Sequence, residues 1–242
     1  MRKVLLKHCD ERNAKIDMLV IHCFALSVKE MINVLNEARL SSHYIIGERG
    51  GIVCCVNENK RAWHAGKSFW RGANNINSRS IGIELCSKTL GQEKYGKKQI
   101  EILIALCKKI IKKHNIPACN VVGHSDIASG RKPDPGFAFP WEYLAQNGIG
   151  IWYDIKNAKK VKTDNIAELL ALIGYNTEDE TSVRASAYTF CCHFAPQYVY
   201  KDENISHLIE NVLPNDFSFM QEREFLQILK AVAYSYLKQL QH

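Results

Sequence analysis

The loop at residues 123–136 holds a histidine, a lysine and an aspartate, His124, Lys132 and Asp134, directly after the short apolar run 120–122. Its glycines and prolines argue against a regular helix or strand through this segment. Loops that follow a rigid strand commonly present metal ligands and proton-transfer groups, and imidazole and carboxylate both suit zinc. Taken by itself, however, the loop fits an ordinary polar surface turn at least as well.

Two strand-length apolar runs each carry a polar side chain. His22 lies near the end of the run 16–23, a pattern typical of a strand that is buried on both faces. Glu84 interrupts a second such run, 81–85. Burying an unpaired carboxylate costs on the order of several kcal/mol or raises its pKa, which favours a functional role for Glu84 over an outward position on an edge strand. A single histidine such as His22 is more often a satisfied core residue, unless partners lie nearby.

The stretch 60–72 mixes aromatic and cationic residues with glycines. Its tryptophans, Trp63 and Trp70, recur at neither the helix nor the strand period, so the stretch fits a ligand-facing loop at least as well as core packing. An indole ring there could stack on the apolar C–H face of a sugar. Core packing is the alternative for both tryptophans.

Interleaved strand and helix patterns predict the scaffold that must position these side chains. Residues 41–56 predict a β-hairpin around a glycine turn, and residues 121–122 a short strand. Amphipathic patterns predict helices at 28–40, capped by Ser27, and at 97–114. The expected fold class is α/β, with a central mixed β-sheet flanked by helices.

The last third of the chain is predicted to be helical. A lysine-rich, weakly patterned linker precedes it. We therefore expect an α/β domain at 1–155 and a small all-α domain at 163–242. Helices are expected at 164–175, 184–194 and 217–240.

The composition is that of an ordinary globular protein: 242 residues, 46% hydrophobic and 24% charged. No apolar run approaches the roughly 20 residues of a membrane helix. The net charge of +7 comes from scattered lysines, without a nucleic-acid-binding motif, so we expect no nucleic-acid partner. Nine cysteines, mostly inside apolar runs, and the lack of a signal-like start favour a reducing cytoplasm. A periplasmic or secreted location is the alternative if a signal has been removed. The oligomeric state is left open.

The polar side chains at the strand ends could converge across one crevice, as they commonly do in α/β sheets. His22, His124 and Asp134 would then give three zinc ligands and leave the fourth position to water, which is the mark of a catalytic site. Glu84 would be the base that takes the proton of this water. Lys132 could reach the oxyanion that forms when the water attacks a carbonyl.

Six short motifs occur in order along the first two thirds of the chain. They are Val20-Ile21-His22, Ser42-His43-Tyr44-Ile45-Ile46, Arg61-Ala62-Trp63-His64-Ala65-Gly66, Ser80-Ile81-Gly82-Ile83-Glu84-Leu85, Gly123-His124-Ser125-Asp126-Ile127 and Arg131-Lys132-Pro133-Asp134-Pro135-Gly136. Together they resemble the zinc-dependent N-acetylmuramoyl-L-alanine amidases of the AmpD/AmiD type, over roughly residues 10–150. Agreement of all six blocks is specific where any one would be weak.

The resemblance implies a function and a role for each matching residue. It makes His22, His124 and Asp134 the Zn²⁺ ligands, Glu84 the catalytic carboxylate and Lys132 its electrostatic helper. The substrate it implies is peptidoglycan or a muropeptide, cleaved between N-acetylmuramic acid, or its 1,6-anhydro form, and L-alanine. Substrate contacts are expected at four further positions, which are His43, Trp63, His64 and Asn77.

Two details place the chain within this superfamily. Phage lysozyme-like and animal peptidoglycan-recognition amidases have a cysteine as third ligand and a tyrosine before the His43 position, whereas this chain has Asp134 and Ser42. The pairing resembles the bacterial AmpD/AmiD branch. The alternative function is a non-catalytic peptidoglycan-recognition protein on the same fold, but such proteins usually lack a ligand or the catalytic group.

The C-terminal segment is similar to the three-helix peptidoglycan-binding-like domain that follows some of these amidases. It departs from the usual pattern at Tyr188-Thr189, where Phe-Gln is common. Glycan binding and a purely structural packing role are equally compatible with this segment.

Overall fold

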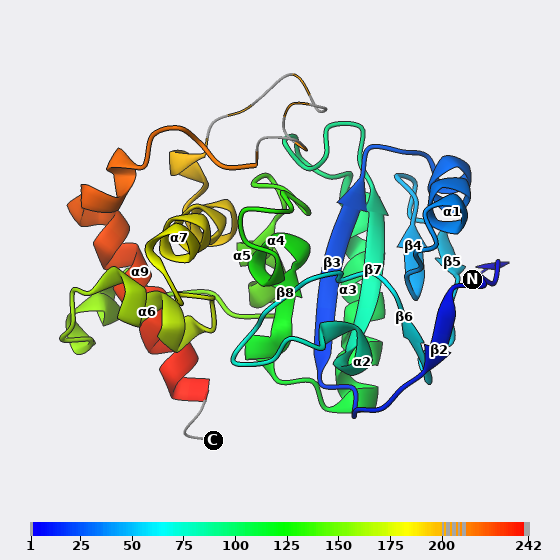
Figure 1. The fold of residues 1–242 in the computed structure, drawn as a ribbon, viewed down its shortest axis with the longest axis horizontal. Helices are drawn as coiled ribbons and strands as arrows, with labels where there is room; N and C mark the ends of the chain where they lie inside the picture. The colour runs from blue at the N-terminus through cyan, green and yellow to red at the C-terminus, as the bar shows by residue number, and fades with distance from the viewer. Residues whose placement is uncertain are drawn as a thin grey trace.

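The computed structural model describes residues 2–199, 201, 204, 207, 209 and 212–239. Its centre is a mixed six-stranded sheet in the order β1-β5-β4-β7-β3-β8 (Figure 1). Strands β4 and β5 pair antiparallel as the predicted hairpin, and the other pairs are parallel. Strands β2 and β6 form a separate antiparallel pair. The strands are β1 (Arg2–Lys3), β2 (Cys9–Glu11), β3 (Met18–Phe24), β4 (Tyr44–Ile46), β5 (Ile52–Cys54), β6 (Lys60–Ala62), β7 (Ser80–Cys86) and β8 (Val121–Gly123).

Helices cover the sheet and form the C-terminal part of the chain. Figure 1 shows α3 behind the central strands, α1 at the β5 end and α6, α7 and α9 gathered beyond β8. The α-helices are α1 (Val28–Glu37), α2 (Ile76–Arg79), α3 (Lys97–His114), α4 (His124–Ile127), α5 (Trp141–Gln146), α6 (Ile166–Ile173), α7 (Glu180–Phe194) and α9 (Arg223–Gln239). The 3₁₀ turns are η1 (Ala118–Asn120), η2 (Ile155–Lys160), η3 (Pro196–Tyr198) and η4 (Ser218–Gln221). The predicted α/β class, with a mixed sheet flanked by helices and a helical C-terminal part, is confirmed.

Residue alternation along β3 and β7 separates the face of the sheet that packs on α3 from the face that carries the functional side chains. Leu19 and Ile21 of β3 join Ile81 and Ile83 of β7 in the core that packs on α3. Side chains alternate between the two faces of a strand, so the even-numbered residues, including His22, point the other way. Strands β3 and β7 are parallel and in register, and the functional side chains of both therefore share the face opposite α3.

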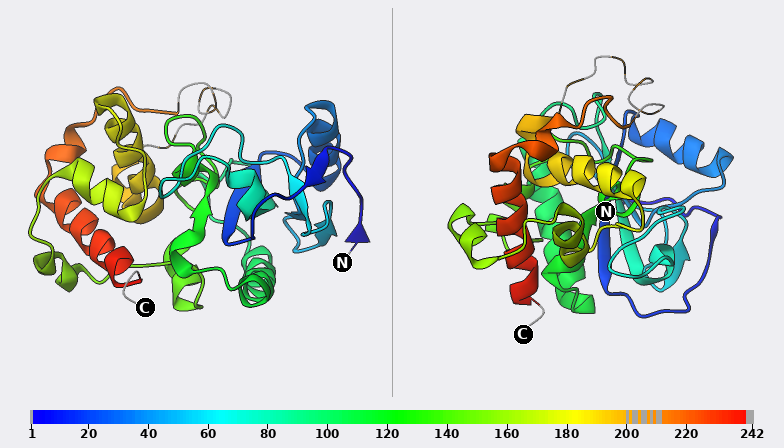
Figure 2. Two further views of the ribbon diagram at one scale, coloured as in Figure 1. Left: turned by 60° about the horizontal axis from the view of Figure 1, so that its bottom comes forward. Right: turned by 60° about the vertical axis from the view of Figure 1, so that its left-hand side comes forward.

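The C-terminal helices share a continuous apolar core with the α/β part. Val20 of β3 and Trp70 belong to the same buried cluster as Tyr175, Phe190 and Tyr236. Figure 2 shows α6, α7 and α9 as one layer against the rest of the molecule. The division into domains at 1–155 and 163–242 stays a prediction. In the structure the two parts pack against each other through one shared apolar core.

Local signals set most element ends. Helix α1 begins with a capping box, in which Ser27 and Glu30 bond each other's backbone N–H groups. Helix α3 has the predicted bounds and ends at Asn115, which adopts the left-handed conformation. One turn of helix, α4, begins the 123–136 loop, because glycine and proline are absent between Gly123 and Gly130. Within the described part of the chain, none of the helices has both the length and the apolar character needed to cross a membrane.

Candidate active site

Strand pairing brings the candidate residues to one place on the face of the sheet opposite α3. Register pairs His22 of β3 with Glu84 of β7. On the other side of β3, Ile21 pairs with Gly123, the last residue of β8. His124 follows immediately and therefore lies beside His22, with the two ring centroids 4.4 Å apart.

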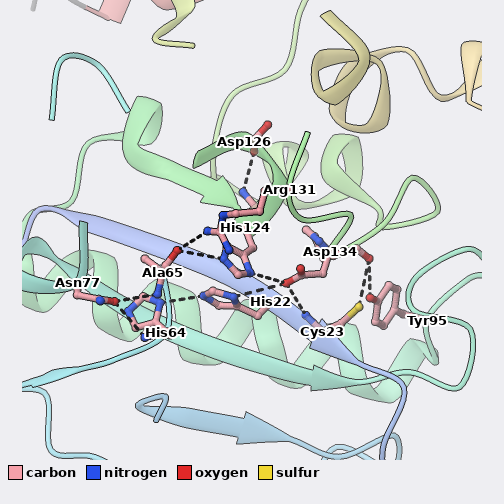
Figure 3. A network of polar contacts seen from close by, with 12 residues as sticks. His22, Cys23, His64, Ala65, Asn77, Tyr95, His124, Asp126, Arg131 and Asp134 are labelled. Atoms are coloured by element: carbon pink, nitrogen blue, oxygen red, sulfur yellow. Dashed lines mark hydrogen bonds and ion pairs between the residues drawn. The ribbon is translucent and has the colours of Figure 1, made fainter. Parts of the chain in front are cut away.

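Three predicted ligands form a compact, buried donor cluster (Figure 3). One donor atom each from His22, His124 and Asp134 lies within 4.8 Å of the other two. Asp134 Oδ2 is 3.5 Å from His22 Nδ1 and 3.2 Å from His124 Nδ1, and it accepts a 3.3 Å hydrogen bond from the Cys23 N–H. Two imidazoles and one carboxylate are a suitable set for a catalytic metal with an open fourth position.

The protonation states of the cluster also suit a metal. Burial, together with the nearby His124, lowers the pKa of His22 to about 4, so His22 is neutral at neutral pH. Burial raises the pKa of Asp134, but His124 and His22 outweigh this and hold it below the usual range. A metal binds neutral imidazole and ionised carboxylate, so little proton release is needed.

Glu84 is buried, and one oxygen of its carboxylate has no hydrogen-bond partner among the described residues. The residue is 2% exposed, and this oxygen is Oε2. Burial and the negative charge of Asp134 raise its pKa well above the usual range, while the charge of Lys132 opposes this rise. A carboxyl group in this setting can hold or accept a proton near neutral pH, as a general base requires.

Lys132 is half-buried and lies two residues before Asp134 in the same loop. Its positive charge contributes to the lowered pKa of His22 as well as acting on Glu84. The cation is therefore close enough to interact electrostatically with the donor cluster.

The four predicted substrate-contact residues lie in different environments. Trp63 is half-buried, so part of its surface is open to a ligand. His43 is fully buried, and His64 is 8% exposed and contacts His22. Asn77 accepts hydrogen bonds from the backbone N–H groups of His64 and Ala65. Direct contact with substrate stays a prediction for these residues, and the geometry favours a supporting role for all but Trp63.

The expectation that Trp70 could stack on a sugar is wrong. Its side chain is 1% exposed, and its Nε1–H donates a 3.1 Å hydrogen bond to the Cys119 carbonyl. Tyr175 and Tyr236 from the C-terminal part pack against the indole edge-on. Because these partners lie more than a hundred residues away, local periodicity could not identify Trp70 as a core residue.

Asp126 is the centre of a hydrogen-bond network that was not predicted from the sequence. Its carboxylate accepts hydrogen bonds from the Gly123 N–H (2.7 Å) and the Tyr175 hydroxyl (2.6 Å), and lies 2.8 Å from His193 Nδ1. The His193 ring is stacked on Trp141, with the centroids 3.9 Å apart. Asp126 therefore caps the turn that carries His124 and ties it to the C-terminal helices.

The buried imidazole of His43 links stability to pH. Burial and the adjacent Arg12 lower its pKa from 6.5 to about 3. The unfolded chain protonates at the ordinary pKa, so the stability due to neutral His43 is complete above about pH 6.5 and falls toward pH 3, by up to about 1.4 kcal/mol per pH unit. Chemical denaturation at about pH 7.5 and about pH 5 measures this loss.

The variant His43→Asn keeps an acceptor for the Gly82 N–H. Its free energy of unfolding is expected to depend less on pH than that of the wild type. An unchanged pH dependence would contradict the assignment of this loss to His43.

Comparison with known proteins gives consistent matches. A family model described as N-acetylmuramoyl-L-alanine amidase matches residues 12–137. The chain is 37% identical to the N-acetylmuramoyl-L-alanine amidase AmiD of Escherichia coli K12 over 209 residues, which cover 75% of this chain and 76% of AmiD. It is 43% identical to the 1,6-anhydro-N-acetylmuramyl-L-alanine amidase AmpD of Enterobacter cloacae, over 42% of this chain and 54% of AmpD.

Two solved structures are similar over nearly the whole chain. One is E. coli AmiD in complex with the substrate anhydro-N-acetylmuramic acid-L-Ala-D-γ-Glu-L-Lys, with a TM-score of 0.73 and 32% identity over 95% of this chain and 92% of AmiD. The other is AmpDh3 from Pseudomonas aeruginosa, with a TM-score of 0.76 and 29% identity over 93% of both chains. Both alignments cover more than nine tenths of this chain and therefore include most of its helical C-terminal part.

Proposed function

Because this chain belongs to the N-acetylmuramoyl-L-alanine amidase family, we propose that His22, His124 and Asp134 hold a catalytic zinc ion. The chain is a hydrolase of the amide bond between N-acetylmuramic acid, or its 1,6-anhydro form, and L-alanine. The observation that carries the metal assignment is the convergence of three buried donor atoms within 4.8 Å of one another.

The donor set supports zinc as the metal. Two neutral imidazole nitrogens and one carboxylate oxygen suit zinc, whereas calcium and magnesium prefer sites made of oxygen ligands. When bound, the ion supplies a Lewis acid that polarises the amide carbonyl and lowers the pKa of water.

The protein side chains near the cluster complete the chemistry. Glu84, on the same sheet face as His22, takes a proton from the attacking water and passes it to the departing amine of L-alanine. The positive charge of Lys132 stabilises the negative charge that develops on the carbonyl oxygen. A recognition protein without catalysis is disfavoured, since the three ligands and Glu84 are all present.

We propose muropeptides, including those with 1,6-anhydro-N-acetylmuramic acid, as substrates. The support is that AmiD and AmpDh3, which resemble this chain along most of its length, have been solved with anhydromuramic peptides. We also propose a reducing compartment, because all nine cysteines are free thiols and seven of them are buried.

Metal analysis and a cleavage assay test the proposed function together. The purified protein is expected to contain about one zinc per chain and to release the peptide from an anhydromuramoyl-peptide, as followed by mass spectrometry. Prolonged chelation should abolish the release, and added zinc should restore it. Zinc-loaded protein that leaves the amide intact would contradict the proposal. Parallel assays on intact sacculi would measure the preference between the two substrate forms.

A further inference from the structure

Two adjacent residues, His64 and Ala65, contact the outer ring nitrogens of the two histidine ligands (Figure 3). His22 Nε2 lies 2.9 Å from His64 Nδ1, and His124 Nε2 lies 3.3 Å from the Ala65 carbonyl oxygen. A neutral imidazole carries its proton on one nitrogen only. These two contacts can therefore decide which nitrogen of each histidine is available to a metal.

His124 lies between two acceptors, the Ala65 carbonyl oxygen at Nε2 and the Asp134 carboxylate at Nδ1. Once a metal binds on the Asp134 side, the Ala65 carbonyl oxygen is the remaining acceptor, so His124 Nε2 carries the proton and donates it. The lone pair is then on His124 Nδ1, which lies 3.2 Å from Asp134 Oδ2. This is the nitrogen that faces the donor cluster.

A chain of three hydrogen bonds places the proton of His22 on Nε2 as well. The Ser80 hydroxyl donates to the Ile76 carbonyl oxygen (2.7 Å), and its oxygen therefore accepts from His64 Nε2 (3.1 Å). With its proton on Nε2, His64 presents a lone pair on Nδ1 and accepts from His22 Nε2–H. His22 Nδ1 is thus unprotonated and lies 3.5 Å from Asp134 Oδ2.

The surrounding structure holds the 64–65 segment in this position. The Asn77 side-chain oxygen accepts from the His64 N–H (3.0 Å) and the Ala65 N–H (2.8 Å). Arg131 Nη2 donates a 2.9 Å hydrogen bond to the Ala65 carbonyl oxygen.

Gly82 makes room for the His64 ring. A Cβ atom at this position of β7 would lie 2.7 Å from Cγ of His64. The glycine therefore allows the imidazole to lie directly on the strand, beside His22 of the neighbouring strand β3.

We propose that His64 is a positioning residue that fixes the Nε2–H tautomer of His22, while the Ala65 carbonyl fixes the same tautomer of His124. Both ligands thus present Nδ1 to the metal. This inference rests on the proposed function, and it assigns to His64 a role behind a metal ligand in place of a contact with substrate. Ser80 acts through His64, and Arg131 acts through Ala65.

Zinc affinity in variants of the full chain tests the proposal. His64→Phe keeps a ring over Gly82 but removes the acceptor for His22, so the dissociation constant for zinc is expected to rise about 10- to 100-fold. His64→Asn keeps an acceptor near the Nδ1 position and should recover much of the affinity. His114→Phe, the same substitution at the end of α3, is the matched control and should leave the affinity unchanged. Competition with a chromophoric zinc chelator measures all three.

Nitrogen NMR of the zinc-loaded wild-type protein provides a test without any variant. The ring ¹⁵N shifts of His22 and His124 are expected to show Nε2 protonated and Nδ1 unprotonated in both. An Nδ1–H tautomer for His22, or a zinc affinity of His64→Phe within about twofold of wild type, would overturn the inference. An increase in KM with unchanged zinc affinity would instead identify His64 as a substrate contact. Failure of the proposed function would appear differently, as wild-type protein that binds no zinc or cleaves no muropeptide.

Discussion

Replacing Glu84 with glutamine is expected to lower kcat by about 10²- to 10⁴-fold, the range that a general base contributes. Glutamine has nearly the same shape but cannot take a proton from water. Because Glu84 is not among the three donor residues, zinc content should stay near that of the wild type. Steady-state cleavage of an anhydromuramoyl-peptide, with metal analysis of the same samples, measures both effects.

The matched control for this variant is Glu101→Gln on α3, the helix that covers the opposite face of the sheet. It should leave kcat unchanged. A general base contributes at least about a hundredfold to kcat. If Glu84→Gln bound zinc fully and kept more than about a tenth of the wild-type kcat, Glu84 would not be the base.

Removing the C-terminal helices, by ending the chain at residue 162, is expected to leave the α/β part without a stable fold. The apolar face formed by Val20, Trp70 and Val122 shares its core with Leu169, Phe190 and Tyr236, and all of these side chains are at most 1% exposed. Exposing such a surface removes a large hydrophobic contribution to folding. Soluble yield, circular dichroism and thermal denaturation of the fragment measure the loss.

A single substitution in the complete chain measures how much this shared core contributes to the free energy of unfolding. Phe190→Ala, at a fully buried position in α7, is expected to lower the free energy of unfolding by about 3–5 kcal/mol. Ile155→Ala, at a position 48% exposed, should change it by less than about 0.5 kcal/mol. A 1–162 fragment as stable as the whole chain, or a Phe190→Ala change as small as that of Ile155→Ala, would show that the C-terminal helices are an independent module.

The Asp126 network extends this argument from stability to the site. Tyr175 and His193 reach Asp126 from the C-terminal part, and Asp126 caps the turn in which His124 lies. The C-terminal helices thus support the loop that carries two of the three ligands. The Asp126 carboxylate thus both caps the turn and bonds to side chains from the C-terminal part of the chain.

The elements were predictable to the extent that their signals are local. The stripe of α3, the cap of α1 at Ser27 and the glycine turn between β4 and β5 each depend on residues a few positions apart. The apolar runs of β3 and β7 were visible for the same reason. The packing of the C-terminal helices on the α/β part was not visible, because an amphipathic stripe shows that a helix face is buried without showing what buries it.

The sequence by itself determined which side chains could do the chemistry. His22 and Glu84 interrupt apolar runs, and His124, Lys132 and Asp134 crowd one short loop, so residue type and local context were sufficient to select them. Only the tertiary structure decided how these side chains are supported. His64 lies 42 residues from His22, Tyr175 lies 49 from Asp126, and Trp70 is covered by Tyr236. Hydrogen-bond partners and ring tautomers depend on which elements pack together, and that packing is a property of the whole chain that no local period encodes.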